Sequence, residues 1–403
     1  MVQPKEDVYK RMARRIGYPR SKALRGAFKI WCTPEEGEVW LELARMAPPL
    51  GEKPPAPVFA EDIAKTLNRD KSVVEEQIES LFQKGLTNEI KRPDGTVYHT
   101  AVTSCEPISN AVGYLFGTRD WDDKTRSWRN KWVADILDRM QDFEHNDWWR
   151  WQRVDELVNR QVTFTILPAY TALLKSNAEL PYPEWCHAGL MAQRAESLGK
   201  SILARPCICR VRMREKNCTL PVWTCVPIVE DDKMYGLPLT PDDRRVTSTP
   251  ERRGQFRRLA PEEFLEIFRH AEEDLNAVHI GLPNGSYFCT CCNDCCDWLT
   301  PVLKYSKEPS EAVDPSPYRS VVNKGLCQGC VEDCVPRCRF KAIKGQTDRS
   351  SGKVQAAVDL KRCVGCGQCV LGCKVDSAIK LELATKLGNP PPIWDNRLTG
   401  ALA

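Results

Sequence analysis

The stretch from Cys327 to Cys373 constrains this chain of 403 residues most strongly, because it holds eight of the 20 cysteines in two similar groups. The first group reads C-Q-G-C-V-E-D-C-V-P-R-C, the second reads C-V-G-C-G-Q-C-V-L-G-C, and an Ala-Ile pair follows each. Three cysteines a few residues apart, with a fourth downstream, are typical of cubane iron–sulfur ligation, since one loop can place three thiolates around the core. The repeat therefore predicts two [4Fe-4S] clusters.

This segment resembles the bacterial two-[4Fe-4S] ferredoxin domain over residues 321–383. The second group has the family's spacing, with Gly365 and Gly367 where the chain must bend tightly. The first group departs from it, because three residues separate Cys330 from Cys334. In this family the fourth cysteine of each group binds the other cluster. The resemblance therefore implies two ligand sets: Cys327, Cys330, Cys334 and Cys373 for one cluster, and Cys363, Cys366, Cys369 and Cys338 for the other.

Cationic residues follow the fourth cysteines, where the ferredoxin family has proline. Arg339 and Lys374 occupy these positions. Positive charge near a cluster favours its more negative, reduced state, so both residues should raise the reduction potential. A pair of zinc ribbons is the alternative, but zinc ribbons use two widely separated CxxC knuckles. The ferredoxin-type spacing favours iron and sulfide.

A second set of nine cysteines lies upstream. A CxCR segment begins at Cys207, residues 289–296 read C-T-C-C-N-D-C-C, and a helix predicted over 261–275 could bring the two together. Nine thiols exceed what one cubane needs, and we expect a third iron–sulfur centre; zinc and buried reduced cysteine are the alternatives. Arg210 could donate hydrogen bonds to sulfide or to an anionic substrate. The expected ligands are drawn from Cys209, Cys218, Cys225, Cys292, Cys295 and Cys296.

The order of these segments resembles a family of multi-domain iron–sulfur electron carriers from anaerobes. In that family a CxCR segment precedes a paired-cysteine segment and a C-terminal two-cluster domain. The resemblance covers most of the chain and implies electron transfer to a redox protein or a catalytic oxidoreductase subunit. No phosphate-binding glycine loop, nucleophile elbow or dinucleotide fingerprint occurs in the sequence, so no catalytic residue is assigned.

Residues 31–109 are predicted to form a winged-helix-like domain. Thr33 and Glu36 can close a capping box at the start of its first helix. Two more helices and a hairpin over 87–100 follow. Such domains often bind DNA, but the third helix is acidic, which would repel phosphates. We therefore expect a scaffold or docking role. The acidic residues are Asp70, Glu75, Glu76 and Glu79.

The whole chain is predicted to be an α+β, multi-domain protein. The expected divisions are a basic N-terminal segment (1–30) that is a solvated arm or helix, or docks an acidic partner; the winged-helix-like domain (31–109); a helical middle domain with the cysteine-rich site (110–305); a linker (306–320); the ferredoxin domain (321–385); and a tail (386–403).

Net charge and cysteine content indicate which partners and which cellular compartment to expect. The formal net charge of +4 does not indicate nucleic acid binding. No apolar segment suits an export signal or a membrane span. Many cysteines in a chain without an export signal favour metal over disulfides, so we expect a reducing cytoplasm. Three functions stay open: electron transfer, a reductase with its substrate site in the middle domain, and a redox-sensing DNA-binding regulator.

Overall fold

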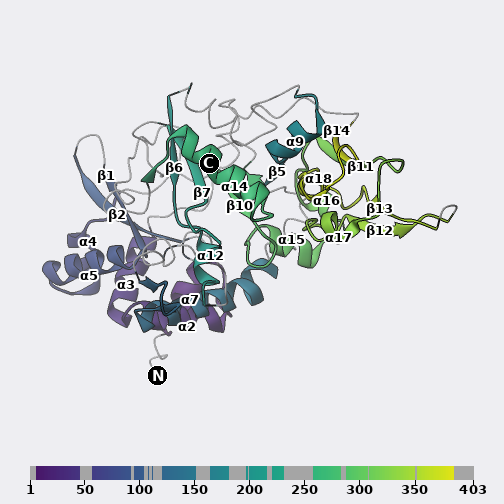
Figure 1. The fold of residues 1–403 in the computed structure, drawn as a ribbon. Helices are drawn as coiled ribbons and strands as arrows, with labels where there is room; N and C mark the ends of the chain where they lie inside the picture. Colours follow the sequence, from purple (N-terminus) through teal and green to yellow (C-terminus); the bar gives the residue numbers. More distant parts are fainter. Residues whose placement is uncertain are drawn as a thin grey trace.

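The computed structural model describes residues 6–45, 57–91, 95–103, 108, 111, 120–150, 164–180, 197, 199–215, 220–230, 257–282, 287–306, 308–349 and 352–384. It confirms the mixed α+β character. The N-terminal helices form one end of the molecule, a six-stranded sheet lies between, and the C-terminal domain forms the other end (Figure 1). The tail lies outside the described residues. Among the helices that are described, none is long and apolar enough to cross a bilayer.

The basic N-terminal segment is helical and belongs to a core. It forms α1 (Val8–Arg15) and α2 (Lys22–Trp31). Met12, Ala27 and Phe28 are fully buried, while the lysines and arginines of both helices keep partial or full exposure. A solvated arm is therefore ruled out for the described part of this segment, because apolar residues at helical spacing bury one face.

Three helices and a hairpin then follow in the predicted order. They are α3 (Pro34–Ala44), α4 (Ala60–Leu67), α5 (Lys71–Gln83), β1 (Thr87–Lys91) and β2 (Val97–Ala101), with β1 and β2 antiparallel. The capping box between Thr33 and Glu36 is confirmed. Glu75 and Glu76 are exposed on α5. The assignment as a winged helix stays a prediction.

Glu36 also joins α3 to α5. Its carboxylate accepts hydrogen bonds from the Ser80 hydroxyl and the Lys84 ammonium, each at 2.6 Å. Burial alone would raise the pKa of Glu36, but the bonds from Lys84, Ser80 and the Thr33 backbone outweigh it and hold that pKa below its usual value. The Glu36 side chain thus caps α3 and also holds α5 against it.

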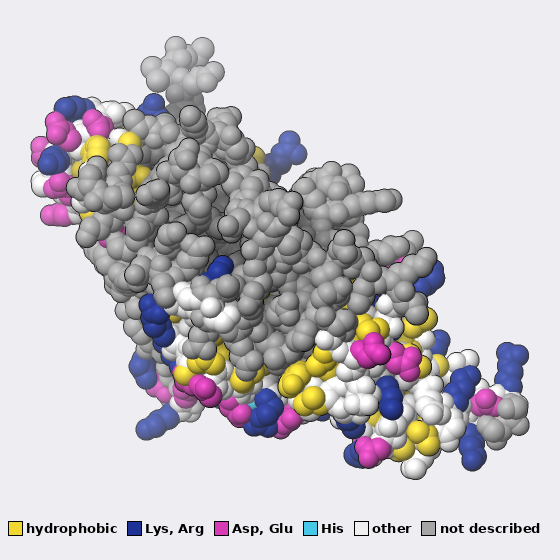
Figure 2. Space-filling model, turned by 90° about the horizontal axis from the view of Figure 1, so that it is seen from above, with side chains coloured by type: hydrophobic (Ala, Val, Ile, Leu, Met, Phe, Trp, Pro, Cys, Tyr) yellow, Lys and Arg dark blue, Asp and Glu magenta, His cyan; other side chains and the backbone are white. Residues whose placement is uncertain are grey.

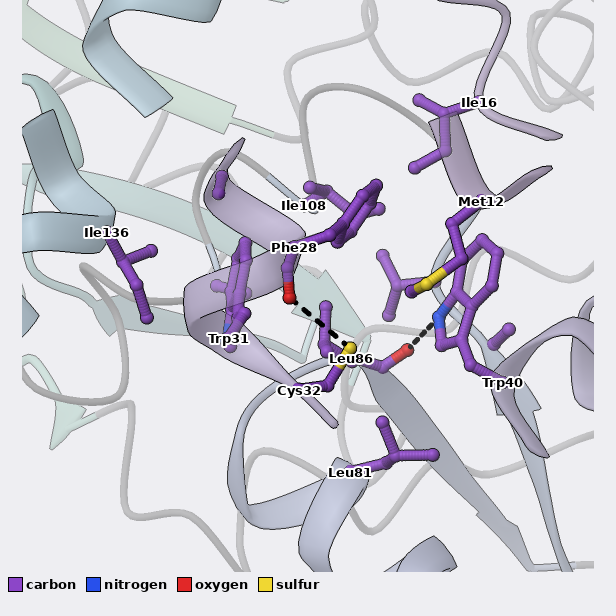
Figure 3. Packing of buried hydrophobic residues seen from close by; sticks show 14 of the residues in the cluster. Met12, Ile16, Phe28, Trp31, Cys32, Trp40, Leu81, Leu86, Ile108 and Ile136 are labelled. Atoms are coloured by element: carbon purple, nitrogen blue, oxygen red, sulfur yellow. Dashed lines mark hydrogen bonds between the residues drawn. The ribbon is translucent and has the colours of Figure 1, made fainter. Parts of the chain in front are cut away.

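Figure 3 shows the apolar core behind these helices. Trp40 Nε1 donates a hydrogen bond of 2.9 Å to the Leu86 carbonyl, and Cys32 Sγ lies 3.6 Å from the Phe28 carbonyl oxygen. Burial raises the pKa of Cys32 to about 12, so the thiol stays protonated. Cys32 therefore packs in this core as a small apolar residue.

The middle region contains a sheet that the helical prediction missed. Its strand order is β5-β9-β10-β7-β6-β8, and all pairs are antiparallel. Strands β5, β9 and β10 are buried at every position, so they lack the apolar–polar alternation that identifies a half-exposed strand. The strands are β5 (Thr165–Leu167), β6 (Lys200–Ala204), β7 (Cys225–Glu230), β8 (Arg257–Arg258), β9 (Val278–Gly281) and β10 (Tyr287–Cys291).

Helices surround this sheet. The predicted helix after Ala260 is confirmed as α14 (Pro261–Glu273), which has proline in its first turn. α7 (Lys131–Phe143) packs against α2 and continues into a π-helical turn, η1 (Glu144–Trp148). The other described elements are β3 (Trp121–Asp122), β4 (Ser127–Trp128), α9 (Tyr170–Ser176), α12 (Ile208–Arg212) and α15 (Leu299–Tyr305).

The C-terminal domain pairs its strands across the two halves of the repeat. Only β12 and β13 form a hairpin, while β11 and β14, the first and last strands, pair with each other. Each half therefore supplies one strand to each two-stranded sheet. The elements are β11 (Tyr318–Val322), α17 (Val331–Cys334), β12 (Ile343–Thr347), β13 (Val354–Val358), α18 (Gln368–Gly372) and β14 (Ile379–Leu383).

The predicted linker, 306–320, is built into the fold. It contains α16 (Pro309–Ala312) and the beginning of β11. The Ile166 N–H donates a hydrogen bond of 2.8 Å to the Asp314 carbonyl, and the Thr165 hydroxyl donates one of 2.9 Å to its carboxylate. These bonds fasten the segment to β5 of the middle sheet, so it is not a free tether.

Candidate metal centres

The C-terminal domain encloses two cavities, each lined by one of the two predicted sets of four cysteines. The outer cavity has about 260 Å³ of space between its atoms and contains Cys327, Cys330, Cys334 and Cys373. The inner cavity has about 310 Å³ and contains Cys338, Cys363, Cys366 and Cys369. The structure thus brings together the thiols of each set, including the fourth cysteine that crosses from the other half of the repeat.

Backbone geometry directs these thiols inward. Gly365 and Gly367 have positive φ of 73° and 82°, in the region that favours glycine, and they turn the chain between the cysteines of the second group. Backbone N–H groups also point at sulfur: the Ala342 N–H lies 3.1 Å from Cys338 Sγ, and the Ala356 N–H lies 3.4 Å from Cys327 Sγ. Such donors stabilise thiolates, the form that binds metal.

Burial makes some thiols in each cavity reluctant to ionise. It raises the pKa of Cys334 to about 11 and that of Cys369 to about 12. For Cys369 the Ser320 hydroxyl, 3.1 Å from Sγ, partly opposes the effect of burial. Bound cations would stabilise such thiolates far more strongly than water can at these sites.

With an iron–sulfur cluster bound in the inner site, replacing Ser320 with alanine should lower the reduction potential of that cluster. The hydroxyl lies 3.1 Å from Cys369 Sγ and would donate a hydrogen bond to this sulfur when it binds metal as a thiolate; such a bond is stronger when the site carries more negative charge. A loss of ~1 kcal/mol corresponds to about 40 mV for one electron. EPR-monitored redox titration of the anaerobic protein measures the shift. Ser320→Thr keeps the hydroxyl and should stay near the wild-type value; an equal shift in both variants would contradict this role.

A third, central cavity lies in the middle region and is lined by eight cysteines. It has about 520 Å³ of space between its atoms. The cysteines are Cys207 and Cys209 at the start of α12, Cys225 on β7, Cys289 and Cys291 on β10, and Cys292, Cys295 and Cys296 on the loop after β10. Cys289 and Cys291 share a face because side chains alternate along a strand.

Six of these thiols are neighbours in a closed circle. Each one affects the pKa of the two beside it, in the order Cys207, Cys209, Cys296, Cys291, Cys289 and Cys225, and the last is again next to the first. A hydrogen bond of 3.4 Å joins Cys289 Sγ to Cys225 Sγ. The neighbouring thiols of Cys225 and Cys291 lower the pKa of Cys289. A separate contact joins Cys292 to Cys295, and an oxygen of Asp294 lies within 4.8 Å of both sulfurs.

Buried positive charge accompanies the thiols. Arg210 is 1% exposed and donates hydrogen bonds to neutral acceptors: the Pro221 and Thr290 carbonyls and the Thr224 and Thr290 hydroxyls. Burial disfavours its charge, but nearby cysteines, including Cys207, outweigh burial and raise the pKa of Arg210. The guanidinium is therefore held by the protein, which speaks against the predicted contact with an anionic substrate.

A buried ion triad stands beside the cavity. Arg212 bonds to both carboxylate oxygens of Asp297 at 2.8 Å and to the carboxylate of Glu144 on the π-helical turn. The Arg212 and Glu144 side chains are at most 3% exposed. The triad fixes the position of Asp297 and therefore of its chain neighbour Cys296.

Five of the six cysteines predicted for this centre come together in the central cavity: Cys209, Cys225, Cys292, Cys295 and Cys296. Cys218 lies outside the described residues, as do Cys105 and Cys186. The prediction omitted Cys207, Cys289 and Cys291. The C-x-C spacing at 289–291 was the available signal, because on a strand it places two thiols on one face.

The inner cavity adjoins the central cavity. Cys338 and Cys366 of the inner cavity pack against the same apolar cluster that contains Cys289, Cys291 and Cys296. Arg339 adds a polar connection, since its guanidinium bonds to Asn293 Oδ1 at 3.1 Å in the loop after β10. The outer cavity has no member in this cluster among the described residues, and Cys327 and Cys330 are partly exposed. The three cavities therefore follow in the order central, inner, outer.

No family model, no curated protein and no solved structure matches this chain. Its own residues define a protein with three thiol-lined cavities that are compatible with metal centres. The donor sets are all-cysteine in the outer and inner cavities and cysteine-rich in the central one. Sulfur donors of this kind suit iron–sulfur clusters or zinc.

Proposed function

We propose that this protein is an iron–sulfur electron-transfer protein that works with an oxidoreductase in a reducing cytoplasm. The observation that carries the proposal is the grouping of two sets of four cysteines, in ferredoxin order, around two cavities next to a third thiol-lined cavity. Iron–sulfur clusters bound there would supply one-electron transfer. The chain's own residues hold the ligands, exclude water from the inner site and donate hydrogen bonds to sulfur.

The surface of the C-terminal domain supports an acidic redox protein or oxidoreductase subunit as the partner. Residues 318–384 contain twelve Lys and Arg against six Asp and Glu. Basic side chains project from this end of the molecule in Figure 2. Lys324 and Lys374 are exposed beside cysteines of the outer cavity. Opposite charge speeds the encounter of redox proteins, so a partner with an acidic face fits this end.

Replacing Cys366 with serine tests the proposal. The variant should lose about four irons per chain and part of the visible absorbance, because the inner site loses one of its four thiolates. Iron and sulfide analysis of anaerobically purified protein, with EPR after reduction, measures the loss. Cys32→Ser is the matched control, since Cys32 is buried in the N-terminal core away from all three cavities. Unchanged iron in the Cys366 variant, or zinc in place of iron in the unmodified protein, would sink the proposal.

A reductase with its substrate site in the central cavity is the second candidate. The specific observation in its favour is Asp294, whose carboxylate lies near Cys292 and Cys295 and offers a ligand other than cysteine. A carboxylate ligand exchanges more readily than a thiolate and would leave iron open to substrate. Cyanide added to the reduced protein should change the EPR signal if such a position exists. An unchanged signal favours electron transfer alone.

A further inference from the structure

We infer that the central cavity binds an iron–sulfur assembly of about eight irons, the equivalent of two cubanes, rather than one [4Fe-4S] cluster. The inference deepens the proposed function and rests on it, because it takes the metal to be iron. It goes beyond the third centre predicted from the sequence in stating how much metal the site holds. Three observations carry it: the number of thiols, the size of the cavity and the buried charge.

The number of thiols is twice that of a cubane site. The outer and inner cavities each present four cysteines, whereas the central cavity presents eight. The six-membered circle already exceeds the four ligands of one cubane, and Cys292 and Cys295 form a contact outside it. One cubane would leave half of these buried thiols unused around it. Two cubane equivalents would use all of them.

The size of the central cavity also supports a larger assembly. The two ferredoxin-type cavities of the same chain serve as the reference for this comparison. The two cavities whose cysteines have ferredoxin spacing measure about 260 and 310 Å³. The central cavity, measured in the same way, is about 520 Å³. It is about twice the smaller reference cavity. The cysteines of the central cavity therefore surround more space than those of either ferredoxin-type cavity.

The buried charge separates the central cavity from the other two. The cavity is lined by Arg205 and Arg210 and by one carboxylate, Asp297, which shares Arg212 with Glu144. The carboxylate of Asp294 lies beside Cys292 and Cys295. Among the described residues that line the outer and inner cavities, none is charged. Each thiolate-bound cubane carries net negative charge, and burying that charge is costly without a cation nearby. Two buried guanidiniums indicate a larger anionic load than in the ferredoxin sites.

The test removes the ferredoxin clusters and counts what remains. A full-length variant carries Cys327→Ser, Cys330→Ser, Cys363→Ser and Cys366→Ser, two ligand losses in each ferredoxin cavity, and none in the central cavity. It is purified anaerobically, and iron, zinc and acid-labile sulfide are measured per chain. We expect about eight irons and a similar amount of sulfide to remain. About four irons would overturn this inference and leave the proposed function intact. Zinc, or no metal, would overturn the third iron–sulfur centre as well.

If the fourfold variant does not fold, the iron content of the unmodified protein tests the inference. The unmodified protein should hold about sixteen irons if the inference is right and about twelve if the central cavity takes one cubane. Cys207→Ser provides a second readout in that background. Cys207 is outside the ligand set expected for a single third cluster, so its loss should change the iron content or the EPR spectrum only if the cavity uses its additional thiols. An unchanged content and spectrum would count against the larger assembly.

Discussion

Alanine at Gly365 is expected to abolish the inner site. Gly365 has a φ of +73° between Cys363 and Cys366, and an added Cβ would collide with the Tyr318 carbonyl oxygen and the Ser316 hydroxyl. The backbone atom cannot move without opening the start of β11, so the cost should be several kcal/mol, at the upper end of single substitutions. Anaerobic thermal unfolding and iron analysis should show a lower Tm and a loss of about four irons.

Gly352 supplies the matched control for this substitution. It has a similar φ of +67° in the turn between β12 and β13, but an added Cβ would meet nothing within 4 Å. Gly352→Ala should therefore cost only the conformational strain, about 1 kcal/mol, and keep the full iron content. If both variants showed the same fall in Tm and the same loss of iron, strain at positive φ alone would explain the result. The contact of the added Cβ with the Tyr318 carbonyl oxygen would then not be the cause.

Replacing Arg212 with methionine is expected to destabilise the protein by about 3–5 kcal/mol. The change leaves the carboxylates of Glu144 and Asp297 buried without their cation, and an uncompensated buried charge is among the most costly defects a mutation can create. Because Asp297 follows Cys296, the central site should also lose metal. Chemical denaturation under anaerobic conditions and iron analysis measure both effects.

Arg269 provides the matched control for the Arg212 substitution. It also bonds to two carboxylates, those of Glu266 and Glu273, but its side chain is 51% exposed. Water solvates the two carboxylates when the cation is removed, so Arg269→Met should destabilise the protein far less than Arg212→Met does. Equal losses in the two variants would show that the number of ion pairs, and not their burial, sets the effect.

The grouping of the C-terminal cysteines into two sets of four could be predicted because their spacing is local. All eight thiols lie in one short stretch, and the crossing of the fourth cysteine followed from the family resemblance. Helix boundaries with local capping signals, at Thr33 and Pro261, were equally accessible. In each case the residues that determine the structure are near one another in the sequence.

The central cavity could be predicted only in part, because its shape depends on pairing between distant strands. Cys289 reaches Cys225 through the antiparallel register of β10 and β7, which no local pattern encodes. Strands buried on both faces carry no alternation, so the sheet and the role of Cys291 were missed. The linker prediction failed for a similar reason, since the bonds between Asp314 and Thr165 join segments far apart in the chain.

The anchoring of Asp314 to β5, together with the bond from Arg339 to Asn293, has a mechanical consequence. Many redox proteins carry a small domain on a flexible arm that swings between donor and acceptor. Here several bonds join the C-terminal domain to the middle region, including one from Gln368 Nε2 to the Ala277 carbonyl, so the fold itself sets the distance between the inner and central cavities. Under the proposed function, electron transfer between these two cavities would need no movement of the domain. Its rate should therefore not depend on the viscosity of the solvent.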